Sequence, residues 1–330
     1  MMRAVAIDRF GGPDVLDVRE IDAPVPRPGE VRVRVAFAGI NYIDVYMRSG
    51  VYARSATYQS PLPMVLGMEG AGVVEALGDG VHDVHVGQSV AWCIVRGAYA
   101  EKAIVPAWRL VPVPAGVPLD VACALMLQGS TAHYLTHSAW PLEAGQTCLV
   151  HAGAGGVGQL LIQLAKRRGA NVIATVGTPE KAALARGRGA DHAILYRDVA
   201  FREEVRRITD GAGVDVVYDS VGRDTVHDSI RSLRKRGLCV MFGASSGQVD
   251  CIAPLELAEA GSVFFTRPHL ADYMRDASEI RMRAAELFAA YEGGELTVAI
   301  QRVLSLRDAP LAHRLLETRQ SLGKLLLALE

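Results

Sequence analysis

The sequence contains few cysteines, no long apolar run and almost no net charge. Its five cysteines, at positions 93, 123, 148, 239 and 251, are scattered and form no Cys-x-x-Cys pair. This usage is typical of reduced thiols, so we expect a cytoplasmic protein rather than a disulfide-bonded secreted one. No stretch approaches the roughly 20 apolar residues of a membrane span. The beginning, Met1-Met2-Arg3, lacks the apolar region of a signal peptide.

The charges nearly cancel, with 35 Lys and Arg against 36 Asp and Glu. This balance argues against a general nucleic-acid binder. The basic runs Lys166–Arg168 and Arg231–Arg236 are short, and we interpret them as solvated helix faces. We therefore expect neither a nucleic acid nor a membrane as a partner.

The chain is long enough for two domains with separate cores. Residues 1–125 carry short strand patterns that Gly and Pro interrupt, which predicts a mostly β domain built as a small, partly open barrel. The expected strands there are Leu16–Ile21, Val31–Phe37, Gly70–Leu77 and Ser89–Ile94.

Residues 126–266 instead alternate apolar strands with helical patterns. Near-continuous apolar strands are typical of a parallel sheet buried on both faces, so this domain is predicted to be α/β and doubly wound. The expected strands are Cys148–Val150, Val172–Val176, Ala193–Leu195, Val214–Tyr218 and Leu238–Phe242.

The last segment, 267–330, is too short for a domain of its own. It reads as a helix over Asp272–Tyr291, a strand near Thr297–Val303, a helix over Ala309–Thr318 and an apolar end. We expect it to complete the first domain, which would make that domain discontinuous.

The most informative motif is the turn His151-Ala-Gly-Ala-Gly-Gly-Val-Gly158, which lies between a strand and an amphipathic helix. Gly153, Gly155 and Gly158 match the spacing G-x-G-x-x-G. This spacing lets the backbone approach a pyrophosphate at a helix N-terminus. The context predicts a dinucleotide site, and His151 itself is expected to satisfy a local hydrogen bond.

The end of the second strand bears on which dinucleotide binds. An NAD site usually carries an acid there for the ribose 2′-hydroxyl, but the sequence reads Gly177-Thr-Pro-Glu-Lys181. Glu180 leaves NADH open as a displaced acid. Gly177, Thr178 and the cation Lys181 favour a 2′-phosphate and therefore NADPH, with Thr178 also a helix N-cap.

With these segments in view, the chain resembles the zinc-free quinone oxidoreductases, a family of the medium-chain dehydrogenase/reductase superfamily that includes ζ-crystallin. The resemblance runs nearly end to end. Its marks are Phe10-Gly-Gly-Pro13, Gly39-Ile-Asn41, Asn41-Tyr-Ile-Asp44, Arg48-Ser-Gly50, Gly67-Met-Glu-Gly70, Gln128-Gly-Ser-Thr131, the 151–158 turn, Val176-Gly-Thr178, Val217-Tyr-Asp-Ser-Val-Gly-Arg-Asp224, Phe242-Gly243, Ser245-Ser-Gly247 and Thr266-Arg-Pro268.

The resemblance implies a GroES-like first domain, a Rossmann domain, a cleft between them and a homodimer. It also implies a role for individual residues. Those implied to bind NADPH are Gly155, Gly156 and Val157 at the pyrophosphate, Gly177, Lys181 and Tyr196 at the 2′-phosphate, Ser220, Phe242, Gly243 and Ser245 further along, and Asn41 and Thr131 near the nicotinamide. The family turn usually has Ala where this chain has Gly153, which we do not expect to abolish binding.

No metal is expected. Relatives that oxidise alcohols hold zinc with a Cys and a His-Glu pair, but this chain has Asn41 and Met68 in place of the Cys and the His. Zinc catalysis needs three protein ligands and an open position. His133 and His137 lie four residues apart on a predicted helix, a spacing that can bind metal, but we expect no third ligand beside them.

Without zinc, the chemistry that remains is hydride delivery to an acceptor that is already electrophilic. Asn41, Tyr46 and Tyr52 are the candidate donors to the acceptor oxygen, and Asp44 is expected to orient Asn41 or the ribose. A structural role for each, in a turn or in packing, stays open. The leading hypothesis is an NADPH-dependent quinone reductase. The alternatives are an enoyl or 2-alkenal reductase on the same scaffold, and a nucleotide-binding structural or RNA-binding protein.

The apolar segment Gly261–Thr266 is predicted to be the last strand of the Rossmann sheet. An unpaired apolar edge invites another chain. We expect it to pair with its copy in a homodimer.

Overall fold

The computed structural model describes residues Met1–Leu329, which divide into two compact units. Unit 1 contains Met1–Ser130 and the chain from Tyr273 onward, and unit 2 is Thr131–Asp272. The return of the C-terminal segment to the first unit agrees with the expectation from the sequence. The domain limits expected at residues 125 and 266 stay a prediction. The two boundaries between the units lie a few residues later in the chain, after Ser130 and after Asp272.

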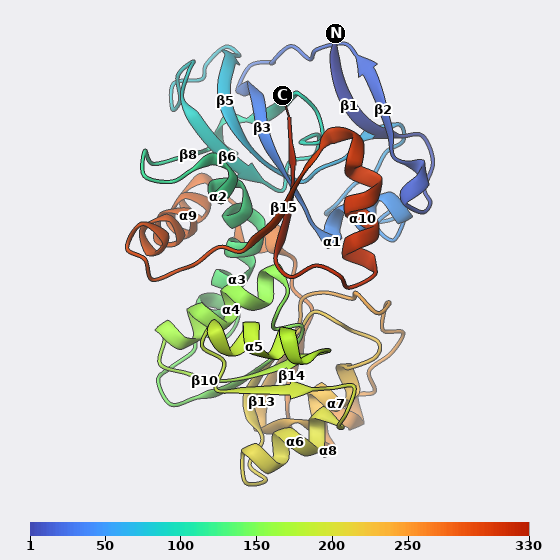
Figure 1. Ribbon diagram of the computed structural model, residues 1–330, viewed down its shortest axis with the longest axis vertical. Helices are drawn as coiled ribbons and strands as arrows, with labels where there is room; N and C mark the ends of the chain where they lie inside the picture. Colours follow the sequence, from blue (N-terminus) through green and yellow to red (C-terminus); the bar gives the residue numbers. More distant parts are fainter. Residues whose placement is uncertain (330) are drawn as a thin grey trace. The chain divides into compact units, whose positions relative to one another are not determined.

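Unit 1 is built on two sheets (Figure 1). The smaller one has the order β2-β1-β4, with β1 (Met2–Ile7), β2 (Asp17–Ile21) and β4 (Met64–Val65). The larger one has seven strands in the order β15-β16-β3-β5-β6-β8, with β7 also on β3. Its strands are β3 (Glu30–Ile40), β5 (Glu69–Leu77), β6 (Ser89–Cys93), β7 (Lys102–Pro106), β8 (Val111–Pro112), β15 (Ile300–Ser305) and β16 (Lys324–Ala328).

The strand β3 shows how the sequence builds this sheet. Val31, Val33 and Val35 are buried, whereas the charged residues between them are partly or fully exposed. Alternation with a period of two puts one set of side chains on each face of a strand. The β16 strand, from the far end of the chain, pairs antiparallel with the end of β3. The larger sheet therefore needs both ends of the sequence.

Apart from the 16-residue α9, the helices of unit 1 are short. They comprise α1 (Tyr42–Ser49), α2 (Leu119–Ala124), the π-helical segment η3 (Leu125–Gly129), α9 (Ala277–Glu292), α10 (Ala309–Glu317), and the 3₁₀ turns η1 (Pro13–Val15), η2 (Ala107–Arg109) and η6 (Leu306–Asp308). α9 begins later than the expected Asp272, because the side chain of Asp276 caps it by accepting from the Glu279 amide at 2.9 Å. A 3₁₀ turn, η5 (Leu270–Tyr273), occupies the earlier residues.

Unit 2 is a six-stranded parallel sheet in the order β11-β10-β9-β12-β13-β14. Counted from β9, this is the 3-2-1-4-5-6 order of a dinucleotide-binding fold. Its strands are β9 (Thr147–Val150), β10 (Asn171–Val176), β11 (His192–Leu195), β12 (Val214–Asp219), β13 (Leu233–Met241) and β14 (Phe264–Thr266), and its helices are α3 (Ser130–Tyr134), η4 (Leu135–Ala139), α4 (Gly156–Arg167), α5 (Pro179–Gly187), α6 (Phe201–Ile208), α7 (Val226–Arg231) and α8 (Pro254–Glu259).

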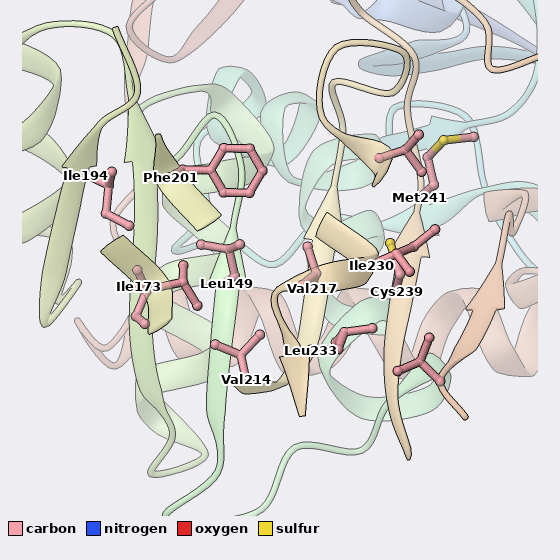
Figure 2. Close-up of a cluster of buried hydrophobic side chains, with 13 residues drawn as sticks. Leu149, Ile173, Ile194, Phe201, Val214, Val217, Ile230, Leu233, Cys239 and Met241 are labelled. Atoms are coloured by element: carbon pink, nitrogen blue, oxygen red, sulfur yellow. The ribbon is translucent and has the colours of Figure 1, made fainter. Parts of the chain in front are cut away.

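The core of unit 2 joins the strands to α6 and α7 (Figure 2). Leu149 and Val217 come from neighbouring strands, and Phe201 and Ile230 come from the two helices. All are buried. A sheet covered by apolar side chains in this way explains why its strands read as continuous apolar runs.

Two strand limits differ from the sequence-based expectation. β14 begins at Phe264 rather than Gly261, because Gly261 and Ser262 have the left-handed φ values +111° and +54°. β15 covers Ile300–Ser305 instead of Thr297–Val303. Between Met1 and Leu329, no helix is long and apolar enough to cross a membrane.

Candidate functional site

The glycine-rich turn connects β9 to α4, with Gly155 as the helix N-cap. A side chain at Gly158 would overlap the Ala152 carbonyl and lie 2.9 Å from the Cα of Gly153. A Cβ at Gly153 would lie 2.8 Å from the Cβ of Ala174 on the next strand. The glycines therefore allow the helix to approach its strand and leave the first amides of α4 available for an anion.

The other candidate cofactor residues follow the carboxyl ends of neighbouring strands. Gly177 follows β10, Tyr196 follows β11, Ser220 follows β12 and Phe242 follows β13. Because the strands are parallel, their carboxyl ends meet at one edge of the sheet, where such folds bind nucleotides. The structure thus brings residues from four separate segments to the same edge as the glycine turn.

The tip of β10 is polar and positively charged. A Cβ at Gly177 would lie 2.9 Å from the Tyr196 hydroxyl and 3.3 Å from Nε of Arg197. Thr178 caps α5 by accepting from the Lys181 amide at 3.3 Å, as expected. Arg197 is exposed, and no ion pair of its guanidinium is present within residues 1–329. Sequence reasoning missed Arg197, although it directly follows Tyr196.

Backbone hydrogen bonds connect the carboxyl ends of β12 and β13. The Ser220 carbonyl accepts from the Ser245 amide at 3.2 Å, and a Cβ at Gly243 would lie 2.7 Å from the same oxygen. The Asp219 carbonyl accepts from the Phe242 amide at 2.8 Å. These bonds place three of the candidate cofactor residues, Ser220, Gly243 and Ser245, next to one another.

A buried network supports this edge. The Asp219 carboxylate accepts from the amides of Val221 and Gly222 and from the Ser229 hydroxyl at 2.7 Å. Nε2 of His151 lies 2.9 Å from Ser229 Oγ, and Nδ1 lies 2.8 Å from Thr175 Oγ1. His151 therefore makes the hydrogen bond expected of it, and makes one at each ring nitrogen. Burial lowers the pKa of His151. A neutral imidazole bonded at both nitrogens holds the start of the turn in place.

In unit 1, the candidate catalytic residues lie on α1 or next to it, with Asn41 and Asp44 at its start. Asp44 is fully buried, and its carboxylate accepts from the Asn41 amide at 2.9 Å and the Met68 amide at 3.0 Å. Burial raises the pKa of the Asp44 carboxyl to about 7. Asp44 therefore orients the backbone of Asn41, one of the two roles expected for it.

The tyrosines form a row of contacting rings. The centroids of Tyr46 and Tyr52 are 5.4 Å apart in an edge-on arrangement, and Tyr58 stacks on Tyr52 at 5.2 Å. Tyr42 continues the row at 5.9 Å from Tyr46. The structure thus brings Tyr46 and Tyr52 together. Within the described residues, the Tyr52 hydroxyl has no hydrogen-bond partner.

Sequence reasoning missed an ion pair beneath Asn41. Lys324 of β16 and Glu69 of β5 are both buried, with the ammonium bonded to the carboxylate. The carboxamide of Asn41 bonds to both: Nδ2 donates to Glu69 at 2.8 Å and Oδ1 accepts from Lys324 at 2.8 Å. The feature of the sequence that pointed to this ion pair was Lys324, a lysine directly before the apolar run Leu325–Leu329.

A second polar chain runs from Asp44 to the surface. Arg48 can only donate, so Nδ1 of His313, at 3.0 Å, accepts from it. Nε2 of His313 then donates to the Tyr99 oxygen, and the Tyr99 hydroxyl donates to Asp44, each at 3.2 Å. Burial and Arg48 lower the pKa of His313 to about 3, which agrees with a neutral ring. Glu317 pairs with Arg48 at the outer end.

Three candidates are not part of these groups. Thr131 is the first residue of unit 2 and lies in α3. His133 and His137 stack their rings at 4.1 Å, and Nδ1 of His137 lies 3.1 Å from the His133 carbonyl oxygen. The absence of a catalytic metal stays a prediction.

The chain is similar to known oxidoreductases along its whole length. Family models described as "Zinc-binding dehydrogenase" and "Alcohol dehydrogenase GroES-like domain" match residues 156–288 and 27–115. A quinone oxidoreductase of Pseudomonas aeruginosa is 40% identical, with 99% of both chains covered. The chain belongs to the quinone oxidoreductase family of the medium-chain dehydrogenases/reductases.

Other members of this superfamily are as similar. A 2-haloacrylate reductase of Burkholderia is 41% identical, with 99% of both chains covered. The solved structure of Escherichia coli quinone oxidoreductase complexed with NADPH has a TM-score of 0.95 and 38% identity, with 99% of both chains covered. The resemblance and the fold class expected from the sequence are confirmed.

The glycine turn yields a test. Gly158→Ala should destabilise the protein by roughly 1–3 kcal/mol, since the methyl group has no space. Gly187→Ala is the matched control, because Gly187 also lies in a helix but has open space around its Cβ position. It should stabilise by up to about 1 kcal/mol. Urea unfolding measures both, and equal stability of the two variants would contradict the packing argument.

Proposed function

We propose that this protein is an NADPH-dependent reductase that delivers hydride to a quinone. The observation that carries the proposal is the glycine turn followed by a cationic strand tip without an acid, in a chain similar throughout to quinone oxidoreductases. NADPH would supply the hydride when bound. The residues of the chain bind it, orient the acceptor and stabilise the charge that develops on the acceptor oxygen.

The residues around the sheet edge suit NADPH. In this proposal, the amides of Gly155, Gly156 and Val157 bind the pyrophosphate at the start of α4. Gly177 gives space to the 2′-phosphate, and the groups that bind this phosphate are Thr178, Lys181, Tyr196 and Arg197. The residues proposed further along the cofactor are Ser220, Phe242, Gly243 and Ser245, with Asn41 and Thr131 near the nicotinamide.

The hydrogen bond to the acceptor oxygen is assigned to Tyr46 and Tyr52. The carboxamide of Asn41 already has partners at both ends, whereas the Tyr52 hydroxyl has none in the described part of the chain. A phenol beside other aromatic rings also offers a flat apolar surface to a quinone. Asp44 keeps the start of α1 in place. The proposed reaction uses no metal, which the residues Asn41 and Met68 at two ligand positions support.

A second acceptor class is favoured by one specific finding. The similarity to a 2-haloacrylate reductase is as high as that to the quinone oxidoreductases. An activated alkene needs the same hydride donor and a hydrogen bond to its conjugated oxygen. An enoyl, alkenal or haloacrylate reductase is therefore the second candidate.

The acceptor is decided by a substrate panel with NADPH. We expect 1,4-benzoquinone and 9,10-phenanthrenequinone to have higher kcat/KM values than short 2-alkenals and 2-chloroacrylate. A preference of more than tenfold for an alkene, equal to about 1.4 kcal/mol in the barrier, would replace the quinone proposal with the second candidate.

The cofactor assignment is tested at the 2′-phosphate. Lys181→Ala and Arg197→Gln should each raise the Kd of NADPH and of 2′,5′-ADP by tenfold or more, because a charge-assisted bond contributes about 1.5–3 kcal/mol. The Kd of NADH should stay within about twofold. Arg186→Gln, another exposed arginine in the same unit, is the control and should change neither. Equal losses for NADPH and NADH would remove Lys181 and Arg197 from this role.

A homodimer is proposed through residues 261–266. Among the described residues, the β14 strand pairs only with β13, and Phe264 on it is 60% exposed. An apolar edge of this kind is stabilised when a second copy covers it. Sedimentation should give a dimer for the protein and a monomer for Phe264→Lys, and a monomeric parent protein would refute the assignment.

A further inference from the structure

The ion pair between Glu69 and Lys324 lies in the interior of unit 1, with 0% and 1% of the two side chains exposed. A buried ion pair loses the solvation of both charges, and replacing it by apolar residues is often neutral or stabilising. Stability alone therefore does not explain the pair. Unlike an apolar pair, the ion pair supplies polar atoms in fixed positions.

Those atoms all have defined partners. One Glu69 oxygen accepts from the Leu127 amide at 2.5 Å, and the other accepts from Lys324 and from Nδ2 of Asn41. A Cβ at Gly39 would lie 2.7 Å from the Glu69 carboxyl carbon and 2.9 Å from the Lys324 nitrogen. Gly39 thus makes space for the pair directly beside Asn41.

The pair determines which way the Asn41 carboxamide points. An ammonium only donates and a carboxylate only accepts, so Oδ1 must face Lys324 and Nδ2 must face Glu69. The remaining capacity is also used, since Oδ1 lies 3.4 Å from Gln128 Nε2 and Nδ2 lies 3.4 Å from the Gly39 carbonyl. A flipped carboxamide would meet like groups at both ends.

We propose that Glu69 and Lys324 are positioning residues, which hold the Asn41 carboxamide in one orientation and thereby fix the start of α1 for the reaction. The inference rests on the proposed function, in which α1 carries Asn41 and Tyr46. In that function, neither charged group is assigned a contact with the acceptor. Their effect reaches the reaction through Asn41, which begins the helix.

The decisive variant neutralises both charges together. Lys324→Met alone should lower Tm strongly, because it leaves the Glu69 carboxylate buried and unpaired. Glu69→Gln/Lys324→Met should recover a Tm within about 5 °C of the parent protein. In this double variant the amide at position 69 accepts either orientation of Asn41. We expect kcat to fall at least tenfold while the Kd of NADPH changes less than threefold.

Two matched variants accompany it. Lys324→Arg keeps a donor-only cation beside Asn41 and should retain kcat within about fivefold. Lys102→Met is the control, because Lys102 bonds to Glu75 in a partly exposed pair of the same unit. It should leave kcat unchanged. A stable double variant with the kcat of the parent protein would reduce the pair to a structural role and overturn the inference.

A measurement on the unaltered protein decides the case even if the double variant does not fold. The chain has only two asparagines, Asn41 and the exposed Asn171. Selective ¹⁵N labelling of asparagine side chains therefore yields two carboxamide signals, with Asn171 as the internal reference. The Asn41 protons should exchange with solvent at least 100-fold more slowly, and equal rates would refute a fixed carboxamide. The exchange measurement does not depend on turnover. If the protein reduces no quinone, that result contradicts the proposed function and not the fixed orientation of the Asn41 carboxamide.

Discussion

The carboxylate of Glu69 is the charge around which the polar interior of unit 1 is arranged. It is fully buried and bonds to the Lys324 ammonium, the Asn41 carboxamide and the Leu127 amide. These three partners belong to β16, to the start of α1 and to the π-helical segment η3. A buried carboxylate without partners is costly. The positions of a strand, a helix and a π-helical turn therefore depend on one another through a single side chain.

In unit 2, the edge of the sheet that contains the glycine turn depends on the space around its backbone rather than on charge. Gly158 and Gly243 are needed because neighbouring carbonyl groups approach their Cα atoms closely. Buried side chains then hold the loops in place, with Asp219 bonded to two amides and His151 bonded on both sides. Such an edge offers backbone amides without competing side chains. In the proposed function, its selectivity for the 2′-phosphate comes from residues at the rim, such as Lys181 and Arg197.

The sequence was most informative where a local pattern has one physical solution. Gly153, Gly155 and Gly158 between an apolar strand and an amphipathic segment predicted the strand, turn and helix that the structure contains. Apolar runs predicted the parallel sheet, and the shortness of the last segment predicted its return to the first unit. Element limits were less accurate, as at α9, because a capping bond such as that of Asp276 depends on backbone conformation.

The interior of unit 1 was not predictable in the same way. Glu69 and Lys324 are 255 positions apart, and no periodicity relates a lysine at a strand start to a glutamate at another. The contact exists because β16 pairs with β3, which in turn pairs with β5. His313 and Tyr99 were likewise separated by 214 positions. A resemblance to a family pointed to Asn41 and Asp44, but only tertiary structure reveals which groups hold them.

The division of unit 1 between the two ends of the chain has a consequence for synthesis. Unit 2 is continuous, so all of its strands leave the ribosome before α9 does. Unit 1 lacks β16 until that strand has been synthesised, and during that time Glu69 has no ammonium to neutralise it. Domains fold as units during translation. Unit 2 is therefore assembled first, and the unit that contains Asn41 and the tyrosines is completed only after β16 has been synthesised.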